Sequence, residues 1–201
     1  MRRMGLPAEY QRTLAREELN ELPIRRYEGE VRLVAAAHEL AEAMAEILAE
    51  TVIGFDTETR PSFRVGQSYP PSLAQVATAR AVYLFRLQHR EAAAALAEAL
   101  AEKRIVKAGV GTADDLRALR KIVEFEEKSV IDLGAVARRH GLSQSGMRYL
   151  AALFLDFRIP KGTRTSNWAA PRLTAQQIAY AATDAWACRE LYLCFRGLGL
   201  L

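Results

Sequence analysis

Cysteine and histidine are scarce in this chain, with 2 cysteines and 3 histidines among 201 residues. Cys188 and Cys194 lie six positions apart, without a C-x-x-C pair or neighbouring histidines. This pattern indicates neither a zinc site nor a disulfide framework. We expect both cysteines to be reduced, which is typical of a protein in a reducing compartment.

Long apolar runs are also missing. No stretch approaches 18 uninterrupted apolar residues, because glutamates interrupt the alanine-rich segments, so a membrane span is not indicated. Residues 1–7 lack the apolar run of a signal peptide. We therefore expect a cytoplasmic protein without a membrane partner.

Charge of either sign is only slightly in excess. The 28 basic and 24 acidic residues leave a formal charge of +4, which is compatible with a polyanionic partner but does not identify one. Half of the residues are hydrophobic, as in ordinary globular proteins. A chain of this length can form a sizeable core without disulfides or a structural metal.

Strand patterns fill the first half of the chain and helical patterns the second. We expect a polar helical extension over residues 1–22 and one domain over residues 23–201. Within that domain, hydrophobic periodicity predicts strands at 24–35, 52–55, 73–79, 81–87, 103–110 and 129–132, and helices at 36–50, 90–102, 114–123, 133–140, 146–154 and 175–196. This distribution predicts an α/β fold, a mixed sheet flanked by helices with a helix-rich C-terminal half.

Asp56 and Glu58 are two residues apart at the end of a short apolar strand. Side chains at i and i+2 of a strand point to the same face. At about 6 Å and an effective dielectric near 20, two such charges repel by roughly 3 kcal/mol, and a bound divalent cation offsets this repulsion. Acidic pairs at strand ends also cap the following element, so this pair alone leaves both interpretations open.

Asp114 and Asp115 follow a strand end marked by Gly109 and Gly111 and stand at the start of a predicted helix. An aspartate at a helix N-terminus is usually a cap. We assign capping to Asp114 and metal ligation to Asp115, although spacing alone does not distinguish the two.

Tyr180 and Asp184 are four residues apart in the final helical pattern, so they share one helix face. Aspartate is a poor residue in the middle of a helix, and burying it without a partner is costly. The alternative is a solvent-facing aspartate beside a half-buried tyrosine.

Three segments together resemble a known family. Residues 53–58, 107–115 and 180–184 resemble, in order and spacing, the three exonuclease motifs of the DEDD superfamily, tyrosine branch, and residues 161–168 resemble the loop before the third motif. The match is greatest to the exonuclease domain of the Werner syndrome helicase and more distant to ribonuclease D. The resemblance implies a ribonuclease H-like (DnaQ-like) fold.

The resemblance also implies a two-metal site that removes nucleotides from the 3′ ends of nucleic acids. By motif position, Asp56, Glu58, Asp115 and Asp184 are the expected ligands of two Mg²⁺ or Mn²⁺ ions, and Tyr180 orients the attacking water. Carboxylates suit such hard cations. Two ions about 3.5–4 Å apart activate the water and stabilise the leaving oxygen.

Residues beside the motifs are candidate substrate contacts, although each also has an ordinary structural interpretation. They are Thr57, Arg64, Lys161, Arg164 and Trp168. The closer resemblance of the second motif to the Werner-type domain favours DNA slightly over RNA. The alternative is an RNA 3′-trimming exoribonuclease of the ribonuclease D type. A non-catalytic nucleic-acid-binding module is disfavoured, because such a module would have lost at least one of the acids.

Overall fold

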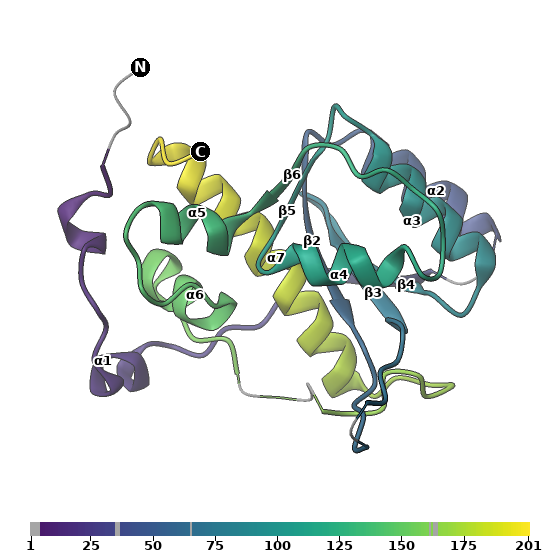
Figure 1. Ribbon diagram of the computed structural model, residues 1–201, viewed down its shortest axis with the longest axis horizontal. Coiled ribbons are helices and arrows are strands. Elements are labelled where there is room, and N and C mark those ends of the chain that lie inside the picture. Colours follow the sequence, from purple (N-terminus) through teal and green to yellow (C-terminus); the bar gives the residue numbers. More distant parts are fainter. Residues whose placement is uncertain (1–4, 35–36, 65, 161, 163–164) are drawn as a thin grey trace.

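The computed structural model describes every residue except 1–4, 35–36, 65, 161 and 163–164 (Figure 1). Its six-stranded mixed sheet has the order β1-β4-β3-β2-β5-β6. Strand β3 is antiparallel to both of its neighbours, and the other pairs are parallel. The strands are β1 (Glu30–Val34), β2 (Val52–Glu58), β3 (Leu73–Ala77), β4 (Ala81–Arg86), β5 (Val106–Gly109) and β6 (Val130–Asp132). The predicted α/β class is confirmed.

Helices cover both faces of this sheet (Figure 1). They are α1 (Arg16–Glu21), α2 (Ala37–Leu48), α3 (Arg90–Ala101), α4 (Thr112–Leu119), α5 (Leu133–Arg139), α6 (Met147–Leu155) and α7 (Ala175–Gly197), preceded by a 3-10 turn, η1 (Ala8–Tyr10). In the part of the chain that the structure describes, no helix combines the length and apolar character needed to cross a membrane.

The two sheet faces follow from the alternation of side chains along each strand. Phe55 and Val76 point to the face covered by α2, α3 and α4. Leu73 and Ala77 point to the opposite face, where they pack on the alanines of α7. Both faces of β2, β3 and β4 are therefore largely apolar, and along β2 burial is less complete at Asp56 and Thr57.

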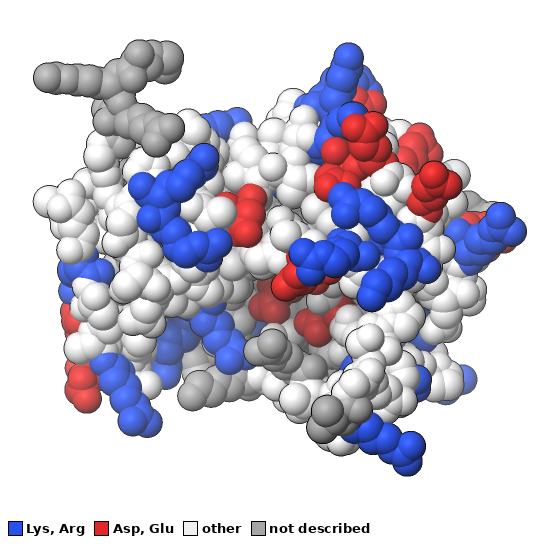
Figure 2. Space-filling view, in the orientation of Figure 1, with Lys and Arg blue, Asp and Glu red and all other residues white. Residues whose placement is uncertain are grey.

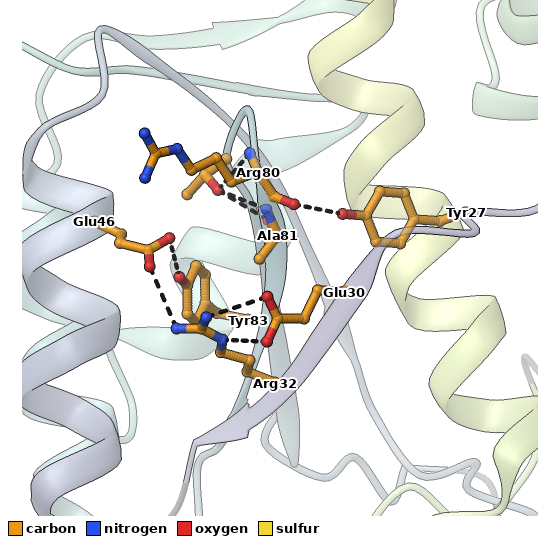
Figure 3. Close-up of polar contacts among 8 residues, drawn as sticks. Tyr27, Glu30, Arg32, Glu46, Arg80, Ala81 and Tyr83 are labelled. Atoms are coloured by element: carbon orange, nitrogen blue, oxygen red, sulfur yellow. Dashed lines mark hydrogen bonds and ion pairs between the residues drawn. The ribbon is translucent and has the colours of Figure 1, made fainter.

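A network of polar contacts secures the β1 edge of the sheet (Figure 3). Arg32 forms ion pairs with Glu30 and Glu46 at 2.8 and 3.3 Å. The Tyr83 hydroxyl donates a 2.5 Å hydrogen bond to Glu46, and the Tyr27 hydroxyl donates one of 3.2 Å to the carbonyl of residue 80. These contacts join β1 to α2 and to the β3–β4 hairpin.

The element boundaries differ from the predicted ones mainly near the N-terminus. The strand predicted from residue 24 begins only at Glu30, and Ile24 instead forms an isolated bridge to Arg158. The helix predicted over 8–22 is α-helical only in α1, because Leu6 and Leu14 must turn inward to pack on the core beneath α6. A short isolated helix has little stability of its own to resist such packing.

The final helix agrees closely with prediction. It was expected over 175–196 and spans Ala175–Gly197. Thr174 and Gln177 form the capping box that their spacing indicates, in which the backbone N–H of Gln177 donates to Thr174 Oγ1 at 3.2 Å. The start of α7, and with it the register of Tyr180 and Asp184, is fixed by this cap.

Candidate active site

Helix α7 crosses directly over β2 at Gly54. A Cβ atom at this position would lie 1.9 Å from the carbonyl oxygen of Ala185. Glycine therefore permits an approach between backbones that no other residue allows. This contact places Asp184, the neighbour of Ala185, over Asp56, which lies two residues beyond Gly54 on the same face of β2.

Three carboxylates meet where β2 and α7 cross. Oxygen atoms of Asp56, Glu58 and Asp184 all lie within 4.8 Å of one another. Glu58 and Asp184 are buried, and Asp56 is partly buried. The structure thus brings the first and third sequence motifs together, and places Asp56 and Glu58 on one face as expected.

Asp115 lies in the same cavity but outside this group of three. Its Oδ1 accepts a 2.5 Å hydrogen bond from Thr57 Oγ1, which links α4 to β2. Asp114 points away from the cavity, where it is exposed and pairs with Arg117 at 2.7 Å. The structure therefore distinguishes the two neighbouring aspartates, which the spacing did not.

The prediction that Asp114 caps α4 is wrong. The helix begins at Thr112, and the cap position is Gly111, whose φ of +77° favours glycine. The backbone N–H of Gly111 donates to Asp132 Oδ1 at 3.1 Å. The same oxygen accepts from Ala135 N–H and caps α5. Asp132, which sequence reasoning did not single out, thus fixes the turn that leads to Asp115.

Tyr180 lines the cavity one helical turn before Asp184. Its ring is supported by Trp168, whose ring centroid lies 6.1 Å away, and by Gly162. A Cβ atom on Gly162 would lie 2.8 Å from Tyr180 Cδ2. Trp168 itself is fully buried, and substrate binding by this residue stays a prediction. Its indole is tilted against the tyrosine ring.

The electrostatics of the site favour cations. Burial raises the pKa of Asp115 and that of Asp184 from 3.8 to about 6. Burial, together with the charges of Asp184, Asp115 and Glu58, raises the pKa of Asp56 well above 3.8. Burial and the nearby carboxylates also raise the pKa of Tyr180, so its hydroxyl remains protonated at neutral pH. Binding a cation would displace protons from the acids.

The donor set fits a hard cation. Every candidate ligand is a carboxylate oxygen, the donor that Mg²⁺ and Mn²⁺ prefer, and the group of three contains no thiolate or imidazole. Two oxygens bound to one Mg²⁺ at about 2.1 Å can be no more than about 4.2 Å apart. The 4.8 Å limit of the cluster is close to this separation, so small side-chain rotations suffice.

Helix α6 supplies a wall of the cavity that sequence reasoning missed. The cavity has a volume of about 660 Å³, and its lining includes Gln144, Met147, Arg148 and Tyr149 as well as the acids. The positive charge of Arg148 lowers the pKa of Asp184. The hollow is visible near the centre of Figure 2, with acidic side chains inside it and basic ones around it. No motif or spacing marks Arg148, which is brought here only by the packing of α6.

The remaining candidate substrate contacts are less directly placed. Thr57 lines the cavity, where its hydroxyl is engaged with Asp115. Arg64 is exposed on the loop between β2 and β3 and is not among the described residues that line the cavity. Lys161 and Arg164 lie outside the described residues. Substrate binding by these four residues stays a prediction.

Comparison with known proteins identifies the family. A family model described as 3′-5′ exonuclease matches residues 31–197, which include every acid of the cavity. The chain belongs to the 3′-5′ exonuclease family. The expected nuclease class and ribonuclease H-like fold are thereby confirmed, and the protein is a hydrolase.

The relatives of this exonuclease include a helicase-linked exonuclease and a ribonuclease D. It is 31% identical over 157 residues to the mouse bifunctional 3′-5′ exonuclease/ATP-dependent helicase WRN, covering 74% of this chain and 11% of the relative. It is 32% identical over 94 residues to ribonuclease D of Haemophilus influenzae, covering 46% of this chain and 24% of that relative. The solved EXO domain of Aedes aegypti Nibbler superposes with a TM-score of 0.76 at 23% identity, and the superposition covers 88% of this chain and 91% of that structure. The chain spans about half or less of the length of other curated 3′-5′ exonuclease relatives, namely 53% of one from Arabidopsis thaliana, 22% of one from mouse and 17% of one from human.

Proposed function

We propose that this exonuclease removes nucleotides one at a time from 3′ ends by two-metal-ion hydrolysis, with DNA slightly favoured as substrate. The ligands of the Mg²⁺ or Mn²⁺ ions are Asp56, Glu58, Asp115 and Asp184. The observation that carries this proposal is the convergence of three of these carboxylates within 4.8 Å, in a cavity that also contains Asp115 and Tyr180.

The residues of the chain have distinct tasks in this proposal. When bound, the cations supply an activated water and neutralise charge on the leaving oxygen. Tyr180 holds the attacking water by a hydrogen bond, because its protonated hydroxyl can both donate and accept. Its presence beside Asp184 supports assignment to the tyrosine branch. Arg148 faces the same cavity and contributes positive charge toward the phosphate.

The sugar of the substrate is the least constrained part of the proposal. The four acids serve either nucleic acid, and the relatives include both a helicase-linked exonuclease and a ribonuclease D. The similarity of the second motif to the Werner-type domain favours DNA. RNA 3′ trimming is the second candidate. Both cysteines are free, which supports the reducing cytoplasm as the place of action.

One assay tests the reaction and the substrate together. Purified protein is given 3′-labelled or 5′-labelled single-stranded DNA, duplex DNA with a recessed 3′ end, and RNA, each with Mg²⁺, Mn²⁺ or a chelator. We expect immediate release of the 3′ label, a ladder of shortening 5′-labelled products, and no reaction with the chelator. Activity that survives chelation would contradict the metal mechanism, and faster cleavage of RNA would reverse the DNA assignment.

Adjacent residues offer a matched pair of variants for the ligand assignment. Asp115→Asn should lower kcat by at least about 100-fold, because losing even a group that only orients a metal ligand costs roughly 10- to 100-fold. Asp114→Asn, one residue away in the same helix turn, should retain wild-type kcat because Asp114 is exposed and faces Arg117. Equal loss in both variants would indicate disruption of α4 rather than loss of a ligand. Tyr180→Phe should lower kcat while leaving metal binding unchanged.

A further inference from the structure

A second cavity of about 480 Å³ adjoins the candidate active site. Three residues, Gln144, Arg148 and Tyr149, line both cavities, so the two lie side by side. The second cavity lies between α6 and the N-terminal segment that contains α1, and it is lined also by Arg16, Leu19, Asn20, Ile24, Ala152, Arg158, Ile159 and Pro160. It leads away from the acids along the surface of α6.

The chemistry of this second cavity is opposite to that of the first. The described residues that line it include three arginines and no acidic residue. Neither Arg16 nor Arg148 forms an ion pair within the described part of the chain, although the charge of Arg148 also lowers the pKa of Asp184. Arg158 is oriented by hydrogen bonds to the Leu22 carbonyl at 3.0 Å and to Asn20 at 3.4 Å. Guanidinium groups without carboxylate partners are suited to bind phosphates.

Apolar surface accompanies these arginines. Ile24 remains 53% exposed at the rim, and Leu19, Ala152 and Ile159 contribute further apolar lining. Positive charge alternating with apolar surface matches a single nucleic-acid strand, which presents phosphates on one side and base faces on the other.

We propose that the second cavity binds the substrate strand on the 5′ side of the scissile bond, with Arg16 in contact with a backbone phosphate. This inference rests on the proposed exonuclease function. An enzyme that releases single nucleotides has one nucleotide on the 3′ side of the cut. A site that extends beyond the acids by a further cavity therefore accommodates the remaining strand, whose phosphates meet the arginines.

The N-terminal segment that carries Arg16 is held firmly against the domain. Leu14 is buried, and its backbone N–H donates to the Tyr149 hydroxyl at 3.2 Å. Beyond α1, the backbone of residue 25 donates to the carbonyl of Arg158 at 3.0 Å. Arg16 lies outside the residues 31–197 matched by the family model. The segment thus adds to the common catalytic domain a wall that determines how longer substrates bind.

Substrate length provides the test. Arg16→Ala and wild type are compared on a dinucleotide and on a single strand of about 12 nucleotides, of the sugar that the enzyme degrades. We expect KM for the long strand to rise about two- to five-fold, the range for one exposed ion pair. The dinucleotide KM and both kcat values should not change. The slope of log KM against log salt should decrease by about 0.7, the value for one lost contact to a single strand.

Two further variants complete the experiment. Arg104→Ala removes an exposed arginine beyond the end of α3 and should leave every parameter unchanged. Arg16→Lys should restore most of the salt slope because it keeps the charge. If Arg16→Ala changes neither the KM nor the salt slope for the long strand, or weakens both substrates equally, the second cavity does not bind the strand. In that case wild-type activity on both substrates would still support the proposed exonuclease function.

Discussion

The hydroxyl of Thr57 donates a 2.5 Å hydrogen bond to Oδ1 of Asp115 and so joins the strand of the first motif to the helix of the second. This bond lowers the pKa of Asp115, although burial raises it by more. It also selects the rotamer in which Asp115 faces the cavity. Loss of a group that orients a metal ligand in this way typically lowers metal affinity or activity by about 10- to 100-fold.

Thr57→Val should therefore weaken metal binding while leaving the fold intact. The isosteric change removes the donor but preserves the side-chain volume, and we expect an approximately 10-fold loss of Mn²⁺ affinity. Titration calorimetry measures this directly. Thr57→Ser, which keeps the hydroxyl, is the matched control and should bind Mn²⁺ like wild type. Wild-type affinity in Thr57→Val would show that Asp115 needs no such support.

The raised pKa values of the acids predict an unusual pH dependence for the metal-free protein. Asp115 and Asp184 have folded-state pKa values of about 6, above their ordinary value of 3.8. At pH values between the unfolded-state pKa of 3.8 and the folded-state pKa of about 6, the native state binds more protons than the unfolded state. The free energy of unfolding therefore increases as the pH falls through this range. We expect the Tm in chelator to rise by several degrees from pH 7 to about 5.

Bound cations should reverse this trend. Protons and metal compete for the same oxygens, so the increase in Tm caused by Mg²⁺ should vanish below about pH 6. Activity should decline over the same range. Thermal melts at several pH values, with Mg²⁺ or chelator, would reveal both effects. A chelator-treated protein that loses stability steadily from pH 7 to 5 would contradict the assignment of raised pKa values to these acids.

Gly54→Ala should prevent helix α7 from docking on β2. The added Cβ would meet a backbone carbonyl at 1.9 Å, and neither element can move without disturbing the core. We expect a loss of at least about 3 kcal/mol in the free energy of unfolding, the upper range for overpacking. The control is Gly197→Ala at the end of α7, where the added Cβ would have nothing within 4 Å. It should be neutral or slightly stabilising. Denaturant melts of the two variants measure both changes in the free energy of unfolding.

Gly162→Ala should affect catalysis through Tyr180. Its Cβ would press on the tyrosine ring at 2.8 Å, and a shifted hydroxyl would hold the water poorly. We expect kcat to fall about 10-fold with little change in stability, because small misplacements at a reacting centre cost much in rate. In a Tyr180→Phe background the same substitution should have no further effect. Additive losses would mean that Gly162 acts through some other contact.

Much of the candidate site was predictable from local sequence because its residues lie on regular elements. The two-residue period of a strand placed Asp56 and Glu58 on one face, and the helical period did the same for Tyr180 and Asp184. A capping box marked the start of α7 correctly. Periodicity can say which side chains share a face of one element, but the distance between elements depends on packing.

The errors and omissions all concern contacts between elements. The start of α4 depends on Gly111 and on Asp132, which lies in a strand 21 residues later, and so Asp114 was wrongly assigned as the cap. The burial of Trp168 beside Tyr180 was likewise not predictable from its position in a loop. Arg148 was missed because its proximity to the acids arises only when α6 packs on the domain.

The crossing of α7 over β2 has a consequence for the newly made chain. Asp184 lies downstream of all six strands, so a ribosome will have synthesised Asp56, Glu58 and Asp115 well before the third carboxylate of the cluster exists. Until α7 settles onto Gly54, the earlier acids have no partner that gathers them around a cation. The group of three carboxylates is therefore complete only after α7 has been synthesised and has docked at Gly54.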